Sequence, residues 1–151
     1  MLKLIRVMPL ELDESDKLDL IRFAKYDYNK RSAAEMVENA LKEIFQIWRV
    51  SEGEHRALLI TKVIATARGS KTLYVEGLAG MNAGFASRPK ECRELLFELA
   101  RSGGCTSVTG WVQRPGMIKW LEEAGLPLVA SVFMKEVPVS SEVPDVSQSS
   151  A

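Results

Sequence analysis

The sequence has very little histidine and cysteine, the residue types that most often bind metals. Of 151 residues, one is histidine and two are cysteine. His55 lies in a polar turn, and neither Cys92 nor Cys105 has a second thiol or imidazole at metal-site spacing. We therefore expect no metal site. The two cysteines are predicted to be reduced, partly buried thiols in a reducing compartment rather than a disulfide.

An excess of charge of either sign is also missing. The chain carries 20 Lys and Arg against 20 Asp and Glu, so its formal net charge is zero. Binding to nucleic-acid phosphates or to an anionic membrane needs a basic excess, so we expect neither partner. No apolar run is long enough to span a bilayer, and the start at Met1–Arg6 is too charged for a signal peptide. A cytoplasmic location is predicted.

What the chain does have is the balance of an ordinary globular domain. Hydrophobic residues make up 46% and charged residues 26% of the sequence. The length suits one domain with one substantial core. We place this domain at residues 1–137. The stretch 138–151 contains mainly Pro, Ser and Val, and we predict that it is a tail with no core of its own.

Hydrophobic periodicity and turn residues predict an ordered series of elements. Asp13 or Ser15 is expected to cap one helix, and Ser32, with Glu35 three residues later, another. The predicted helices cover 16–26, 32–44, 89–102 and 115–124. The predicted strands cover 2–8, 45–50, 57–67, 72–78, 106–112 and 128–137.

The chain is organised around residues 72–126, which read as strand, turn, helix, strand, helix. Pro89 and Pro115 each suit the first position of a helix. One apolar helical face is formed by Cys92, Leu95, Leu96 and Leu99. Such a unit implies neighbouring parallel strands. We therefore predict a single α/β (α+β) domain, with a mixed, mostly antiparallel central sheet containing one parallel pair and helices on both faces. The strands at 57–67, 72–78 and 106–112 are expected to be central.

This order of elements resembles the GNAT N-acetyltransferase superfamily over nearly the whole chain up to Val137. The segment 120–126, Trp-Leu-Glu-Glu-Ala-Gly-Leu, looks like the end of the family's fourth helix. The pair Leu95–Leu96 resembles the leucine pair of its acetyl-CoA-binding helix. The resemblance implies a GNAT-like fold and, in an active member, acetyl transfer from acetyl-CoA to an amine.

The cofactor side departs from the family pattern. In the family, the pyrophosphate lies against a loop R/Q-x-x-G-x-G/A at the start of the third helix. Aligning the leucine pair puts Ser87 at the Arg or Gln, and Lys90 and Cys92 at the two glycines. Pro89 between them removes an N–H donor. The side chains of Arg88 and Lys90 could hold phosphates by charge instead; alternatively, this segment simply begins a solvated helix.

The catalytic side departs as well. The family often has a tyrosine in the fourth helix as general acid, and Leu121 occupies that position here. Glu76 matches the region where many members place a glutamate base. Its alternative interpretation is an outward-facing strand residue at a turn. The family usually closes with two C-terminal strands, and this chain leaves few residues for the second.

These departures favour a GNAT-fold protein that has lost acetyl-CoA binding. Such a protein serves as a non-catalytic binding or assembly component, like the degenerate members found among tailed-phage genes. This interpretation predicts no cofactor, a protein partner or self-association, and possible placement in a virion. The alternative is a divergent acetyl-CoA-dependent N-acyltransferase. Glu76 would then be the base, and Ser87, Arg88 and Lys90 would form a rebuilt phosphate site.

Overall fold

The computed structural model describes residues 2–25, 30–80, 85, 87–111, 115–129, 135 and 137–138. In chain order its elements are β1 (Lys3–Val7), η1 (Pro9–Glu11), α1 (Glu14–Ala24), α2 (Ala33–Leu41), β2 (Gln46–Glu52), β3 (His55–Ala65), β4 (Lys71–Ala79), α4 (Pro89–Ser102), β5 (Ser107–Gly110) and α5 (Pro115–Glu123).

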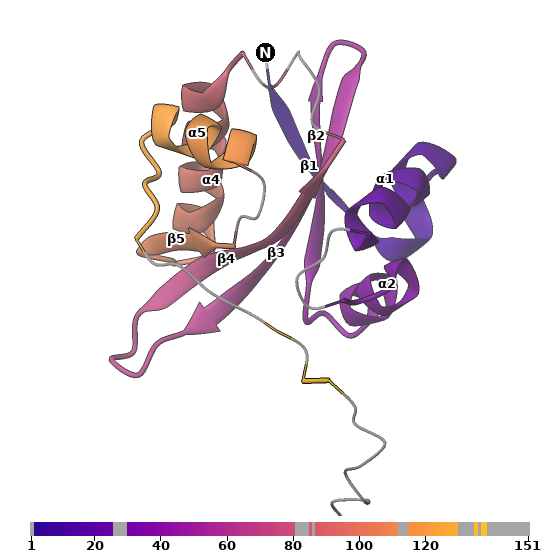
Figure 1. Cartoon of the computed structure of the whole chain (residues 1–151), viewed down its shortest axis with the longest axis horizontal. Coiled ribbons are helices and arrows are strands. Elements are labelled where there is room, and N and C mark those ends of the chain that lie inside the picture. The colour runs from indigo at the N-terminus through magenta and orange to yellow at the C-terminus, as the bar shows by residue number, and fades with distance from the viewer. Residues whose placement is uncertain are drawn as a thin grey trace, which may run out of the picture.

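The five strands form one mixed sheet in the order β1-β2-β3-β4-β5. The pairs from β1 to β4 are antiparallel, and β4 with β5 is parallel. Helices α1 and α2 cover one face of the sheet, and α4 and α5 cover the other (Figure 1). The predicted α/β (α+β) architecture, with its single parallel pair and two helical layers, is confirmed.

The helix starts follow local capping chemistry. The Asp13 carboxylate accepts a hydrogen bond from the Asp16 N–H at 2.9 Å, and the Asp16 carboxylate accepts one from the Asp13 N–H at 3.0 Å. The Ser32 hydroxyl accepts from the Glu35 N–H at 3.1 Å. These bonds satisfy N–H groups that have no partner within a helix. Of the two caps predicted for α1, Asp13 is the one used.

Two hydrophobic cores lie on opposite faces of the sheet. Successive residues of a strand point to opposite faces, so Leu58 and Ile60 of β3 join one core and Leu59 joins the other. The core beneath α1 and α2 also contains Leu20, Met36, Phe45 and Ile47. The core beneath α4 also contains Leu73, Phe85, Leu99 and Ala100. Burial on both faces explains the long apolar run of β3.

Two predictions are corrected by the structure. The strand at 106–112 was expected to be central, but β5 lies at the edge of the described sheet. The second helix was predicted to reach residue 44, but α2 stops at Leu41, and Leu41 and Ile44 are exposed. Most of the strand predicted at 128–137 lies outside the described residues, and Leu128 and Val129 at its start are exposed. Residues 130–134, 136 and 139–151 lie outside the described chain.

Candidate functional site

A β-bulge interrupts β4 where it pairs with β3. Across the β3–β4 ladder, Thr61 lies opposite Val75 and Ile60 lies opposite Gly77. Glu76 is therefore an extra residue with no partner in the ladder. An extra residue resets the alternation of a strand. As a result, Glu76 and Gly77 both face the layer of α1 and α2.

Gly77 leaves no space for a side chain at this bulge. A Cβ atom built there would lie 2.3 Å from the ring of Phe23 in α1. Real carbon atoms do not approach so closely, so the helix can pack against the bulged strand only over a glycine. This contact holds α1 against β4 directly beside Glu76.

The Glu76 carboxylate is buried and bonded through both oxygens. Its Oε1 lies 2.7 Å from Lys62 Nζ, and its Oε2 lies 2.9 Å from Arg31 Nη2. The Glu76 side chain is 3% exposed, whereas that of Lys62 is 33% exposed. The interpretation of Glu76 as an outward-facing residue at a turn is wrong, because the bulge turns it inward beneath the helical layer.

Aromatic rings surround the two cations. Lys62 Nζ lies 5.2 Å from the centroid of Tyr74 and 5.9 Å from that of Phe45. The guanidinium carbon of Arg31 lies 5.0 Å from the Phe45 centroid. Cations are attracted to the faces of such rings, more strongly where water is excluded. Glu76, Lys62, Arg31, Tyr74 and Phe45 are called the Glu76 cluster below.

The Glu76 cluster borders an open length of strand. The parallel pairing of β4 with β5 ends at Val75 and Gly110, while β4 continues through Glu76 to Ala79. Among the described residues, no strand pairs with this part of β4 on the side of β5. Strand-edge N–H and C=O groups can bond an extended ligand. The Glu76 carboxylate thus lies next to the last described pair between β4 and β5, where an extended ligand could pair with β4.

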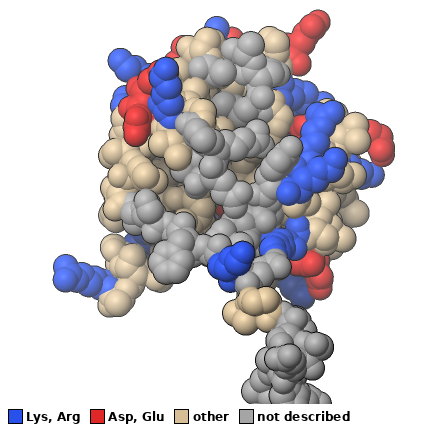
Figure 2. Space-filling view, viewed as in Figure 1, with Lys and Arg blue, Asp and Glu red and all other residues tan. Residues whose placement is uncertain are grey.

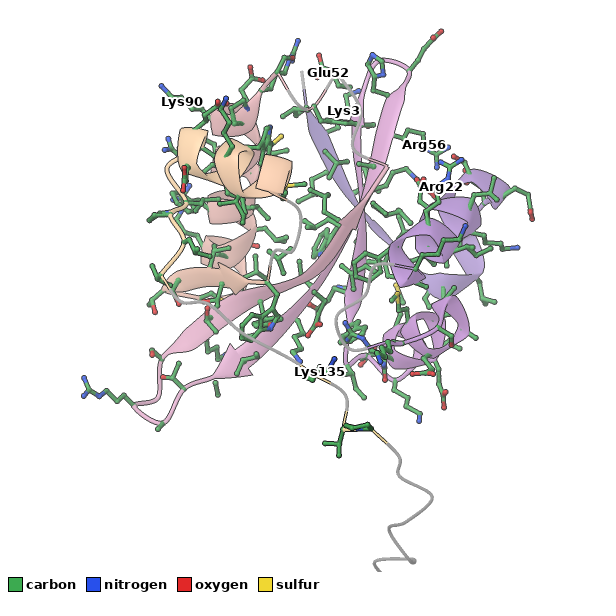
Figure 3. All side chains as sticks on the ribbon, viewed as in Figure 1. Lys3, Arg22, Glu52, Arg56, Lys90 and Lys135 are labelled. Atoms are coloured by element: carbon green, nitrogen blue, oxygen red, sulfur yellow. The ribbon has the colours of Figure 1, made fainter. Side chains whose placement is uncertain are left out.

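The residues predicted to hold phosphates lie together at the start of α4. Pro89 is the first helical residue, as predicted, and contributes no N–H. Arg88 Nη1 lies 3.0 Å from Glu52 Oε1 and 3.4 Å from Glu91 Oε2. Figure 3 labels Glu52 at the end of β2 and Lys90 at the same end of the molecule, on α4. Nearby carboxylates therefore already compensate the charge of Arg88.

The remaining anion-binding groups at this helix start are few. Ser87 and Lys90 are exposed. The N–H groups of the first helical turn have no partner within the helix and point out of its N-terminal end, where they favour anions. Pro89 has no N–H and so reduces their number. Ser87, Arg88 and Lys90 are near neighbours in sequence and lie together at the start of α4. The carboxylates beside Arg88 weaken the positive charge that a phosphate would meet there.

Leu121, at the position where the family often has a tyrosine general acid, lies in α5 and has no proton to donate. The Cys92 thiol is half-buried, and burial raises its pKa, which keeps it protonated at neutral pH. Both cysteines are free thiols, as predicted.

In the described part of the chain, no cluster of His, Cys, Asp and Glu could hold a metal ion. No helix among the described residues is long and apolar enough to cross a membrane.

A second charged cluster anchors α1 to the sheet. Arg49 of β2 pairs with Asp16, whose side chain is 3% exposed. Arg56 Nη2 of β3 lies 2.9 Å from Asp16 Oδ1 and 2.8 Å from Asp13 Oδ2. Figure 3 shows Arg56 and Arg22 close together beside α1. This cluster is separate from the Glu76 cluster and holds the start of the helix in place.

Sequence reasoning missed Lys62 and Arg31, although two signals were present. Lys62 is a charged residue within a long apolar strand, where an ammonium needs a buried partner. Gly77 directly follows Glu76 within a strand pattern, and an isolated glycine there suggests a bulge. Neither signal identifies the partner, because Arg31 and Lys62 lie far from Glu76 in the sequence.

Searches of protein-family profiles and of curated protein sequences found no match. Several solved structures are similar. A structure described as a probable acetyltransferase has a TM-score of 0.65 and 10% identity, covering 93% of this chain and 99% of that one. The aminoglycoside 6'-N-acetyltransferase AAC(6')-Ih from Acinetobacter baumannii has a TM-score of 0.59 and 11% identity, covering 93% and 100%.

A third similar structure is a GNAT family acetyltransferase from Staphylococcus aureus. Its TM-score is 0.53 and its identity 11%, covering 90% of this chain and 98% of that one. At such identities the likeness shows the fold. The chain therefore has a GNAT-like fold, as the order of its elements predicted.

Proposed function

We propose that this chain is a divergent N-acyltransferase that uses acetyl-CoA, the second of the two interpretations above. One observation carries the proposal. The bulge of β4 holds a buried carboxylate 2.7 Å from the Lys62 amine, next to the last described pair between β4 and β5. A carboxylate in contact with an amine is the arrangement that proton removal needs. Bulges also occur often beside active sites.

The open edge of β4 fits the donor better than the start of α4 does. Acetyl-CoA carries amide groups along an extended arm. The N–H and C=O groups between Glu76 and Ala79, which no described strand pairs on the side of β5, can bond such amides as a neighbouring strand does. At the start of α4, Lys90 and the remaining N–H groups would meet the phosphates, while Arg88 is occupied by carboxylates. We therefore expect weak cofactor affinity, dominated by the strand edge.

Glu76 serves as the base in this proposal. An amine attacks a thioester only in its neutral form, so a proton must first leave, and a positioned carboxylate typically accelerates such a transfer by ~10²–10⁴-fold. Leu121 cannot protonate the departing sulfur. The leaving group is nevertheless a thiolate; for comparison, the thiol of free cysteine has an ordinary pKa of about 8.5. It can depart without a general acid at modest cost.

The test is thiol release from acetyl-CoA with a panel of small amines, together with melting temperature in millimolar acetyl-CoA. We expect the cofactor to raise the melting temperature, because a ligand that binds only the native state stabilises it. Glu76→Gln should lower turnover by ~10²-fold or more. Glu98→Gln, on the exposed side of α4, is the matched control and should behave like wild type.

A non-catalytic binding component remains the second candidate, favoured by the pairing of Arg88 with Glu52 and Glu91 and by Pro89 at the first turn. Such a protein would have a protein partner or associate with itself, in the cytoplasm or in a virion. The same measurements separate the candidates. An unchanged melting temperature and no thiol release would overturn the enzyme and leave the fold as a binding surface.

A further inference from the structure

The ammonium of Lys62 lies between one carboxylate and two aromatic rings. Its Nζ is 2.7 Å from Glu76 Oε1. It is also 5.2 Å from the ring centroid of Tyr74 and 5.9 Å from that of Phe45. A carboxylate with aromatic faces beside it has the chemistry that recognises organic ammonium groups. Glu76, Tyr74 and Phe45 therefore form what we call the ammonium cage, and a side chain of the protein itself occupies it.

The two cations bonded to Glu76 are held differently. The side chain of Arg31 is 14% exposed, whereas that of Lys62 is 33% exposed. A lysine side chain is a compact charge on a flexible four-carbon stem, whereas a guanidinium is a rigid planar fork. Rotation of the Lys62 stem can carry its ammonium away from the cage and further into the solvent that it already meets. Lys62 is thus the replaceable cation, and Arg31 is the fixed one.

Aromatic surface continues outward from the ammonium cage. The ring of Trp111 packs edge-on against that of Tyr74, with 6.4 Å between the centroids and an angle of 63° between the planes. Trp111 is 52% exposed. Apolar atoms next to the ammonium of a ligand would therefore have a half-exposed ring to lie against, one ring away from the carboxylate.

We infer that the ammonium cage binds an external alkyl ammonium group, and that Lys62 is an internal competitor that such a ligand displaces. The ligand class is a primary amine on an unbranched alkyl chain, as in a free alkylamine or in the lysine side chain of a peptide. The inference rests on the proposed function for the role of this amine as acceptor. For the binding itself, it rests only on the described side chains.

The charge of the cage selects the ligand. Glu76 is 3% exposed, and a buried charge that loses its partner destabilises the site strongly. Exchange of one ammonium for another leaves the number of cations at Glu76 unchanged. A neutral ligand of the same shape would leave the carboxylate with Arg31 alone. The cage should therefore distinguish an alkyl ammonium from the alcohol of equal length.

The internal competitor also sets the affinity. A ligand can enter only those molecules in which Lys62 has left the cage, so its apparent Kd rises as that fraction falls. Minor conformations commonly have populations of about 0.1–10%, which corresponds to a loss of affinity of about 10- to 1,000-fold. Removal of the Lys62 side chain should therefore strengthen the binding of an alkyl ammonium.

The experiment measures the binding of n-butylammonium chloride to the purified full chain, by calorimetry and by melting temperature at constant ionic strength. We expect Lys62→Ala to bind it at least ~10-fold more tightly than wild type. Glu76→Gln should lose this binding, and n-butanol should bind to none of these proteins. Lys42→Ala is the matched control, because Lys42 pairs with Glu38 at 3.0 Å while both side chains are 60% exposed. It should bind like wild type.

Nuclear magnetic resonance of the wild type needs no variant, so it applies even if Lys62→Ala folds poorly. Excess n-butylammonium should shift the signals of Phe45, Tyr74 and Glu76, and n-butanol should not. The same titration with Nα-acetyl-lysine amide separates the two sources of the ligand. Matching shifts identify a peptide lysine as a ligand, and their absence restricts the ligand to free amines.

Equal affinity of wild type and folded Lys62→Ala overturns the inference, as does equal binding of n-butylammonium and n-butanol. Wild-type shifts that are absent, or that lie away from the cage, overturn it too. Thiol release from acetyl-CoA with an amine that does not bind at the cage overturns the inference, while the proposed function stands. Binding as expected without any thiol release overturns the proposed function and leaves the cage as a binding site.

Discussion

Two aspartates one helical turn apart on α1 lie in opposite environments. Asp16 is buried and bonded by Arg49 and Arg56. Asp19 is also buried, but its described cation is the exposed Arg22 at 3.6 Å. Burial raises the pKa of Asp19, and the nearby Asp16 carboxylate adds to that effect. Asp16 thus has two described guanidinium partners, whereas burial disfavours the charged form of Asp19.

This contrast predicts opposite effects of the same substitution. A pKa raised on folding means that the ionised Asp19 opposes folding above its ordinary value of 3.8. Asp19→Asn should therefore leave stability unchanged or increase it at pH 7, and this gain should vanish as the pH falls below 3.8. Asp16→Asn should cost about 3–5 kcal/mol, because it removes the buried carboxylate that pairs with Arg49 and one of the two carboxylates that contact Arg56.

Urea titration of both variants at pH 7 measures these changes. Arg22→Gln is a useful companion, since it removes the exposed partner of Asp19 and should further raise the cost of the buried charge. A loss of stability in Asp19→Asn as large as that in Asp16→Asn would show that Asp19 is held by bonds as strong as those of its neighbour.

At the scale of elements, the bulge of β4 decides where the candidate site lies. It turns Glu76 inward and demands a glycine at position 77, against the ring of Phe23. Gly77 is needed because a side chain would clash with Phe23, and not because its backbone adopts an unusual φ angle. A substitution at this position therefore tests the steric contact directly.

We predict that Gly77→Ala destabilises the fold by about 1–3 kcal/mol, the usual cost of forcing an extra methyl group into a packed site. Gly116→Ala is the control. In α5, a Cβ at Gly116 meets nothing within 4 Å, and alanine favours a helix by up to about 1 kcal/mol. Thermal or denaturant unfolding compares them. Equal stability of Gly77→Ala and wild type would show that Phe23 moves aside freely.

The elements themselves were largely predictable, because their signals are local. Pro89 and Gly103 delimit α4 at the predicted residues, and the alternation and turns of β2, β3 and β4 mark each strand. The bulge was not predictable in position, since it depends on the register between two strands. Most of the strand expected at 128–137 lies outside the described residues, so it stays a prediction.

At the scale of the whole molecule, the candidate site draws on parts far apart in sequence. Arg31 precedes α2, Phe45 precedes β2, Lys62 lies in β3, and Tyr74 and Glu76 lie in β4. Sequence reasoning identified Glu76 through family resemblance alone, and only folding brings its partners to it. Basic and acidic side chains are mixed on the face shown in Figure 2, in agreement with the zero net charge.

The acid stability of the whole protein should depend on Asp13. The backbone N–H of Asp16 and the Arg56 guanidinium lower the pKa of Asp13 from 3.8 to about 2. A lowered pKa contributes stability above the ordinary value, and this contribution is lost as the pH falls from 3.8 through about 2. Asp13→Ser keeps a helix cap and removes the titrating group. Its stability should therefore change less over this range.

The measurement is the unfolding free energy from urea titrations at several pH values between 2 and 5. Glu14→Gln, one residue along and exposed, is the matched control and should keep the wild-type pH dependence. The same slope in wild type and Asp13→Ser would mean that other carboxylates account for the acid sensitivity.

Among the described residues, the two hydrophobic cores on either side of the sheet share no residue. Each helical layer packs on its own face of the sheet, so we expect the two layers to be able to open separately. Proteins open in such cooperative units at a cost below that of global unfolding. The Glu76 cluster belongs to the layer of α1 and α2, whereas the residues proposed to bind phosphate belong to the layer of α4. A transient opening of one layer would therefore expose the part of the candidate site in that layer and leave the other part intact. The sheet thus separates the two parts of the candidate site as well as supporting both.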